Sequence, residues 1–186
     1  MLEKEVKVLE IDRDLIISRL ESLGARLSFA GRVETYYFDY LDGRFKTEGK
    51  ILRIRKLGDV CYLDLKKQHK PNVAGKTLPN DTQSSDGFGR VKVNEEIRVG
   101  ISNPNELLTI LNDLGLNVVA HLIKYRTSYM LGDVVIEIDE MEGIPTYMEI
   151  EGEEEDIFKT IKLLGLDRNK VVNFTSDEVL KYYGKN

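Results

Sequence analysis

Acidic and basic side chains recur at every second position in a series of short segments of this sequence. Near the start of the chain, Glu3, Glu5 and Lys7 follow this spacing. Because successive side chains of a strand point to opposite faces of a sheet, each segment is predicted to be a strand with one charged and one apolar face. The further segments contribute Arg53 and Arg55, Asp64 and Lys66, Lys92, Glu96 and Arg98, Lys124 and Arg126, Glu137 and Asp139, and Glu149 and Glu151.

Two interpretations fit this alternation. A sheet with one face on a helical core and one face in water gives the same pattern, and it is the simpler interpretation of any single strand. The charged face, however, is rich in arginine and paired carboxylates, and about eight strands in succession repeat it. A sheet of that size tends to curl or close. If the apolar faces pack outward against helices, the charged faces line the interior of a barrel.

Charge placed inside a barrel has a chemical consequence. Burying it is unfavourable unless each group is paired or bound to something. A polyphosphate accepts bidentate hydrogen bonds from arginine and point-charge contacts from lysine. Hard cations such as Mg²⁺ or Mn²⁺ bind carboxylate and phosphate oxygens together. The pattern therefore predicts a site for metal and polyphosphate.

The elements that must position these residues can be predicted from caps and periodicity. Asp12 and Asn103 are suited to helix N-caps, and Gly24 can end a helix in the left-handed conformation. The helices are predicted at about 13–23, from 103 to 115, from 153 to 165, and at about 176–183. The strands are predicted at about 2–10, 33–40, 50–57, 60–67, 90–99, 118–131, 133–139 and 145–151. Residues 68–89 are rich in Gly, Pro and Ser and are predicted to be a loop that covers a site.

Composition restricts the kind of protein. A chain of 186 residues is expected to form one domain. A net charge of −5 argues against broad nucleic-acid binding, which usually shows a basic excess. No apolar run is long enough to span a membrane, and the charged N-terminus does not resemble a signal peptide, so we expect a cytoplasmic protein. The single cysteine, Cys61, and the two histidines indicate neither a disulfide nor a zinc site.

The ordered set of charged motifs resembles a known family. The segment Glu3-Lys4-Glu5-Val6-Lys7 is similar to the E-x-E-x-K signature of the CYTH domain, or triphosphate tunnel metalloenzyme, family. That family includes class IV adenylate cyclases, thiamine triphosphatases and inorganic triphosphatases. The resemblance continues in order to about residue 151, through Tyr37-Phe38-Asp39, Leu52-Arg53-Ile54-Arg55, Leu65-Lys66, Lys124-Tyr125-Arg126, Glu137-Ile138-Asp139 and Glu149-Ile150-Glu151.

The resemblance implies an α+β fold in which residues 1–186 form one domain. This domain is an eight-stranded antiparallel closed β-barrel, a tunnel, with helices packed outside. The implied triphosphate-binding residues are Lys7, Arg53, Arg55, Lys66, Arg98, Lys124 and Arg126. Of these, Lys7, Lys66 and Arg126 are the candidates for a direct part in catalysis. The implied ligands of two Mg²⁺ or Mn²⁺ ions are Glu3, Glu5, Glu137, Asp139, Glu149 and Glu151.

Two positions depart from the family pattern. Thr35 stands where many relatives have Asp. The segment Asn94-Glu95-Glu96 lacks the basic residue that often precedes the acidic pair, which leaves Lys92 or Arg98 as its substitute.

Three functions stay open at this point. The first is a class IV-like adenylate cyclase that converts ATP to cyclic AMP and pyrophosphate. The second is a triphosphatase that hydrolyses inorganic triphosphate, thiamine triphosphate or a nucleoside triphosphate. The third is a non-catalytic polyphosphate-binding module. In each case the expected partner is a small triphosphate, with no nucleic acid and no membrane, and the expected state is a monomer or a homodimer.

Overall fold

The structure is a computed structural model that describes residues 2–68 and 91–185. These residues form two compact units, each of which is described by itself. The first unit contains residues 31–68 and 94–125 together with Leu2, and the second contains residues 3–30, 91–93 and 126–185. This division leaves the expectation of one domain as a prediction.

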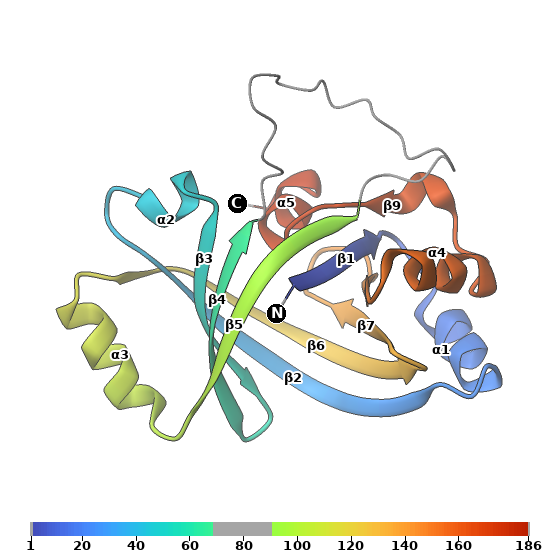
Figure 1. Cartoon of the computed structure of the whole chain (residues 1–186), viewed down its shortest axis with the longest axis horizontal. Coiled ribbons are helices and arrows are strands. Elements are labelled where there is room, and N and C mark those ends of the chain that lie inside the picture. Colours follow the sequence, from blue (N-terminus) through green and yellow to red (C-terminus); the bar gives the residue numbers. More distant parts are fainter. Residues whose placement is uncertain (1, 69–90, 186) are drawn as a thin grey trace. The chain divides into compact units, whose positions relative to one another are not determined.

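The described elements follow one another as in Figure 1. The strands are β1 (Leu2–Val8), β2 (Arg26–Asp39), β3 (Lys50–Leu57), β4 (Val60–Gln68), β5 (Lys92–Ile101), β6 (Asn117–Leu131), β7 (Val134–Glu140), β8 (Tyr147–Glu151) and β9 (Val171–Val172). The helices are α1 (Arg13–Ser22), α2 (Arg44–Thr47), α3 (Pro104–Asp113), α4 (Glu154–Leu163) and α5 (Ser176–Tyr182), with a 3₁₀ turn at Arg168–Lys170.

The strand order is circular. The strands are hydrogen-bonded in the order β5-β4-β3-β2-β6-β7-β8-β1, and β1 also pairs with β5. The pairs β2–β3, β3–β4, β4–β5, β7–β8 and β1–β8 are antiparallel. The predicted α+β fold with a closed eight-stranded barrel is therefore confirmed, and β9 is a short addition beside β1.

The helices begin where the sequence predicts. The Asp12 side chain accepts a hydrogen bond from the Leu15 backbone N–H, and the Asn103 side chain accepts one from the Glu106 backbone N–H. Gly24, just after α1, has a φ of 77°, which a residue with a side chain rarely adopts. None of the helices in the described part of the chain is long and apolar enough to cross a lipid bilayer.

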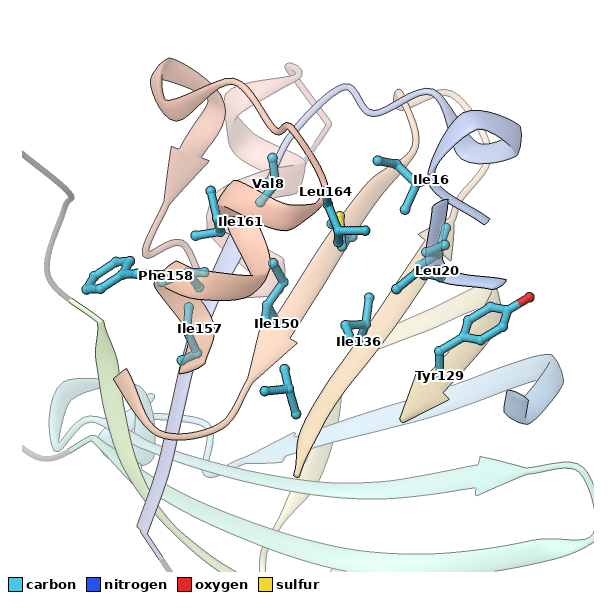
Figure 2. Packing of buried hydrophobic residues seen from close by; sticks show 14 residues of the cluster. Val8, Ile16, Leu20, Tyr129, Ile136, Ile150, Ile157, Phe158, Ile161 and Leu164 are labelled. Atoms are coloured by element: carbon cyan, nitrogen blue, oxygen red, sulfur yellow. The ribbon is translucent and has the colours of Figure 1, made fainter. Parts of the chain in front are cut away.

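The second unit packs two helices against the apolar faces of its strands (Figure 2). Ile157 and Ile161 of α4 and Leu20 of α1 contact a sheet surface that includes Ile136 of β7 and Ile150 of β8. All five side chains are at most 1% exposed. Side chains at alternate positions of these strands therefore cannot point to the helices, and they must occupy the opposite face of the sheet.

The first unit repeats this arrangement with α3. Leu111 of α3 packs with Phe38 of β2 and with Leu52 and Ile54 of β3, and all four are buried. The helices of both units thus cover the apolar strand faces, as predicted.

The loop between β2 and β3 contains an element that the sequence did not predict. Asp39, at the end of β2, accepts hydrogen bonds from the backbone N–H groups of Tyr40, Phe45 and Lys46. The short helix α2 lies in this loop. A four-residue helix has no room for a hydrophobic period, so periodicity could not reveal it.

Other boundaries also differ from the predictions. β2 begins at residue 26, and the predicted start at about residue 33 is wrong. The prediction missed residues 26–32 because they are mostly exposed and lack the alternation used to detect strands. The two-residue strand β9 was also missed. The predicted covering loop, 68–89, lies outside the described residues except for Gln68, which ends β4.

Candidate functional site

In the first unit, charged side chains of three neighbouring strands meet around one aspartate. We call Arg53 and Arg55 of β3, Asp64 and Lys66 of β4, and Glu96 and Arg98 of β5 the arginine cluster. The strand register places Arg53, Asp64 and Arg98 in one line across the three strands, and it places Lys66 opposite Glu96. The alternation seen in the sequence thus brings these side chains to one face of the sheet.

Asp64 is the centre of the arginine cluster and is fully buried. One carboxylate oxygen, Oδ2, lies 3.0 Å from Arg53 Nε and 3.0 Å from Arg55 Nη2. The other oxygen, Oδ1, accepts a hydrogen bond of 2.8 Å from Arg98 Nε. Three guanidinium groups therefore share one negative charge.

Glu96 is the second acidic member of the arginine cluster. It lies 2.9 Å from Lys66 Nζ and 3.6 Å from Arg53 Nη2, and Arg98 also donates to it. Burial lowers the pKa of Arg53 and Arg98, but nearby acidic groups outweigh this effect and hold both pKa values above their usual range: Tyr37, Asp64 and Glu96 for Arg53, and Asp64 and Glu96 for Arg98. The cluster contains four basic side chains and two carboxylates, so it is suited to bind an anion.

In the second unit, the arrangement is reversed around one arginine. We call Glu5 and Lys7 of β1, Arg126 of β6, Glu137 and Asp139 of β7, and Glu149 of β8 the carboxylate cluster. The register aligns Glu137, Glu149 and Lys7 across β7, β8 and β1.

Arg126 is the centre of the carboxylate cluster and is 2% exposed. Its Nε and Nη2 donate to the two oxygens of Asp139 at 2.6 Å each, which is a bidentate pair. Nη2 also donates to Glu149 at 2.8 Å, and Nη1 donates to Glu137. Burial lowers the pKa of Arg126, but Asp139 and Glu137 more than offset it, so the pKa lies well above the usual range.

Lys7 is the second buried cation of this cluster. It donates to Glu149 and lies 3.7 Å from Glu5, which is also 3.3 Å from Lys92 at the start of β5. Burial lowers the pKa of Lys7, but Glu149 and Glu5 outweigh burial and raise it above the ordinary 10.5. Lys7 is therefore a positive charge at neutral pH and a poor proton donor.

The burial of both centres decides between the two interpretations of the alternating pattern. Asp64, Arg126, Asp139 and Lys7 are each at most 2% exposed. A solvated sheet face is therefore the wrong interpretation for these strands, and an interior position of the charged side chains is confirmed in each unit.

The carboxylate cluster can be tested for its fit to a divalent metal. Glu137 lies directly opposite Glu149, and Glu5 directly opposite Glu151, and like charges so placed are unfavourable without a cation nearby. Carboxylate oxygens are the donors that Mg²⁺ and Mn²⁺ prefer. Within residues 2–68 and 91–185, no three His, Cys, Asp or Glu are arranged as a ligand set. The donor chemistry fits a hard cation, while the side chains engage Arg126 and Lys7.

The remaining predicted site residues are placed less centrally. Glu3 is 9% exposed on β1, and Lys124 on β6 and Glu151 on β8 are half-buried. The metal and phosphate roles of these residues, like those of the two clusters, stay predictions. Asp64 was not among the predicted site residues, although it lies on the predicted charged face. Its position two residues before Lys66 was the signal that could have identified it.

This chain is similar to known proteins over most of its length. The profile of the CYTH domain matches residues 1–164. A Methanocaldococcus jannaschii protein named as a candidate adenylate cyclase is 25% identical over 183 residues, which cover 97% of this chain and 95% of the relative.

Two solved structures share the fold. A protein of Vibrio parahaemolyticus described as a candidate adenylate cyclase aligns with a TM-score of 0.77 at 14% identity, over 97% of this chain and 98% of its own. A Hippeastrum protein, described as a candidate adenylyl cyclase with a dominant triphosphatase activity, aligns with a TM-score of 0.64 at 17% identity, over 100% of this chain and 96% of its own. Because the profile match covers most of the sequence, the chain belongs to the CYTH domain family.

Proposed function

We propose that this protein is a divalent-metal-dependent enzyme acting on a small triphosphate, with the conversion of ATP to cyclic AMP and pyrophosphate as the first candidate reaction. The arginine cluster carries the proposal, because its four cations exceed the two carboxylates, Asp64 and Glu96, that are buried among them. A triphosphate supplies several acceptor oxygens and the missing negative charge. The name of the Methanocaldococcus relative supports the choice of cyclase.

In this proposal the arginine cluster holds and orients the phosphates. Arg53, Arg55 and Arg98 exchange part of their contact with Asp64 for phosphate oxygens, while Asp64 keeps the three guanidinium groups aligned. Lys66 supplies a further point charge from the neighbouring position on β4. Lys7, Lys124 and Arg126 are proposed as the phosphate-binding cations outside this cluster.

The carboxylates are proposed to hold the metal. Glu3, Glu5, Glu137, Glu149 and Glu151 would be its ligands. Asp139 uses both oxygens on Arg126, so we assign it to positioning that arginine. When bound, a divalent cation would neutralise charge on the phosphate oxygens and favour deprotonation of the attacking oxygen.

The identity of the attacking oxygen separates the two candidate reactions. In the cyclase reaction, the ribose 3′-hydroxyl oxygen bonds to the α-phosphorus, the bond from that phosphorus to the bridging oxygen breaks, and pyrophosphate leaves. In the second candidate, a water oxygen bonds to the terminal phosphorus, the bond from that phosphorus to the bridging oxygen breaks, and the diphosphate part leaves while the attacked group becomes orthophosphate. The described dominant triphosphatase activity of the Hippeastrum protein is the observation that favours the second candidate.

The test is product analysis with ATP, inorganic triphosphate and thiamine triphosphate, each with Mg²⁺ or Mn²⁺. Cyclic AMP and pyrophosphate from ATP would support the cyclase, and orthophosphate from any substrate would support the triphosphatase. Tight binding without turnover would contradict both and identify a polyphosphate-binding module.

Two variants connect the turnover to the proposed residues. Glu5→Gln should abolish metal-dependent turnover, whereas Glu95→Gln, an exposed carboxylate on β5, should leave it unchanged. Arg55→Ala should weaken binding of triphosphate far more than of monophosphate, and Arg32→Ala, which changes an exposed arginine, should affect neither. Equal weakening of triphosphate and monophosphate would argue against a phosphate clamp.

A further inference from the structure

Asn94 carries a buried hydrogen-bond donor for which the described part of the chain supplies no acceptor. Its side chain belongs to a residue that is 3% exposed. The amide nitrogen Nδ2 has no hydrogen-bond partner among the described residues. A buried donor without an acceptor is unfavourable for folding, so an acceptor from outside the chain would improve this position.

Asn94 lies on the charged face of β5. It is two residues before Glu96 and four before Arg98, and the strand period puts all three side chains on one face. Its register partner is Gln68, two residues along β4 from Lys66. The unpaired amide thus continues the arginine cluster by one position along both strands.

A second buried polar atom without a partner gives a useful contrast. Thr127 Oγ1, on β6, is likewise unpaired among the described residues. Thr127 is next to Arg126 and two residues from Tyr129, which belongs to the apolar core, so its side chain shares the face of the helices and not that of the charges. An unpaired polar atom there is not placed to meet an anion.

We infer that Asn94 is a phosphate-binding residue that donates its side-chain N–H to an oxygen of the bound triphosphate. This inference rests on the proposed function. The surplus of positive charge on the neighbouring positions attracts an anion, and phosphate oxygens only accept hydrogen bonds, which is what an unpaired amide donor requires. Because the amide is neutral, it adds a directional contact without adding charge.

The neutral donor has a measurable signature. Affinity that comes from charge falls as salt screens it, whereas a hydrogen bond from an amide depends far less on salt. Loss of Asn94 should therefore weaken binding at every salt concentration and leave the salt dependence unchanged. Loss of Arg98 should weaken binding and also flatten the salt dependence.

The experiment measures binding of inorganic triphosphate by calorimetry to the full chain over a range of salt concentrations. In Asn94→Ala the dissociation constant should rise about tenfold, the typical effect of losing one hydrogen bond to a charged group. Asn94→Asp keeps the size but replaces the donor with a charged acceptor, so its loss should be at least as large. Thr127→Val should bind inorganic triphosphate as the wild type does. Arg98→Gln is the control for a lost charge, and its dissociation constant should vary less with salt concentration. Thermal melting of each variant verifies folding.

The outcomes separate the inference from the proposed function. If the wild type binds inorganic triphosphate and both Asn94 variants bind it equally well, the amide serves the fold alone and the inference is overturned. If the salt dependence of Asn94→Ala flattens as in Arg98→Gln, the amide acts through the arginines, and direct donation is also overturned. If the wild type does not bind, the proposed function fails, and the inference fails with it.

Discussion

The two charged clusters are inverses of each other. In the second unit, one buried arginine, Arg126, is surrounded by Asp139, Glu137 and Glu149. In the first unit, one buried aspartate, Asp64, is surrounded by three arginines. Each centre neutralises only part of the charge around it. The surplus is therefore negative in the carboxylate cluster and positive in the arginine cluster, so the first is suited to a cation and the second to an anion.

The clusters also differ in their access to water. The side chain of Arg98 is 43% exposed, so part of the positive surplus is already solvated. In the carboxylate cluster the most exposed partner of Arg126 is Glu137, at 22%. Removing the centre of the carboxylate cluster should therefore cost more stability than removing the centre of the arginine cluster.

The largest effect is expected from Arg126→Met, which leaves three carboxylates facing one another. Breaking a buried ion pair by removing one partner typically costs about 3–5 kcal/mol of the free energy of unfolding. Urea unfolding should show this loss, and added Mg²⁺ should recover part of it because Asp139, Glu137 and Glu149 have then lost their shared arginine. Arg13→Met, which breaks exposed ion pairs with Asp14 and Glu140 in the same unit, should cost about 1 kcal/mol or less. An equal loss in the two variants would contradict the central role of Arg126.

The next effect is expected from Asp64→Asn, which leaves three arginines without their shared carboxylate. The loss should be smaller, about 2–3 kcal/mol, because Arg98 can turn to water and the amide oxygen still accepts a hydrogen bond. Because the two clusters carry surplus charge of opposite sign, the response to an anion distinguishes the two variants more sharply than the size of the stability loss does. Inorganic triphosphate should raise the melting temperature of Asp64→Asn more than that of Arg126→Met. The opposite order would show that the two clusters do not differ as described.

A smaller effect is expected from Lys7→Met, about 1–2 kcal/mol, because Glu149 keeps Arg126 and Glu5 keeps Lys92 as partners. The pH dependence has a definite sign. The pKa of Lys7 is raised in the folded protein. Its contribution to the free energy of unfolding is therefore complete below the ordinary pKa of 10.5 and is lost as pH rises through the pKa of the folded state. Urea midpoints of variant and wild type should therefore converge only in strong alkali, and a difference that already shrinks near neutral pH would contradict the raised pKa.

The smallest effect is expected at Glu34, a carboxylate of the first unit that lies outside both clusters. Glu34 accepts hydrogen bonds from the Tyr36 hydroxyl at 2.9 Å and from His121 Nε2 at 2.8 Å. The Tyr36 hydrogen bond is the main reason that the pKa of Glu34 is lowered below 4.5. The contribution of Glu34 to the free energy of unfolding is thus present at neutral pH and is lost as pH falls through the lowered pKa. Glu34→Gln should cost about 0.5 kcal/mol at neutral pH and nothing in strong acid, with no response to Mg²⁺ or triphosphate. A response to either ligand would show that such effects are not confined to the clusters.

Much of this organisation follows from sequence because two-residue spacing is a direct property of strands. The caps at Asp12 and Asn103 and the charged faces of β1, β3, β4, β7 and β8 were all predicted from residue type and spacing. What spacing cannot give is which charges meet, because that depends on the register between strands. Asp64 became a centre only once β3 and β5 were aligned on either side of it.

The departures from the family pattern show the same limit. Lys92 and Arg98 were both substitutes for a missing basic residue, and sequence could not choose between them. In the structure, Arg98 contacts Asp64 in the arginine cluster, whereas Lys92 contacts Glu5. Thr35 is buried on β2 opposite Arg55, where a carboxylate would have added another acceptor.

The three backbone hydrogen bonds accepted by Asp39 have a consequence beyond the loop that they organise. They hold the loop that connects β2 to β3 in one conformation, and this loop supports the alignment of Tyr37 with Arg53 and of Thr35 with Arg55. A shift of this alignment by one residue would turn both arginines to the apolar side. Asp39 belongs to neither cluster, yet it thereby helps to keep Arg53 and Arg55 on the charged face of the sheet. Alterations of residues 40–49 can therefore abolish ligand binding without changing any residue that contacts the ligand.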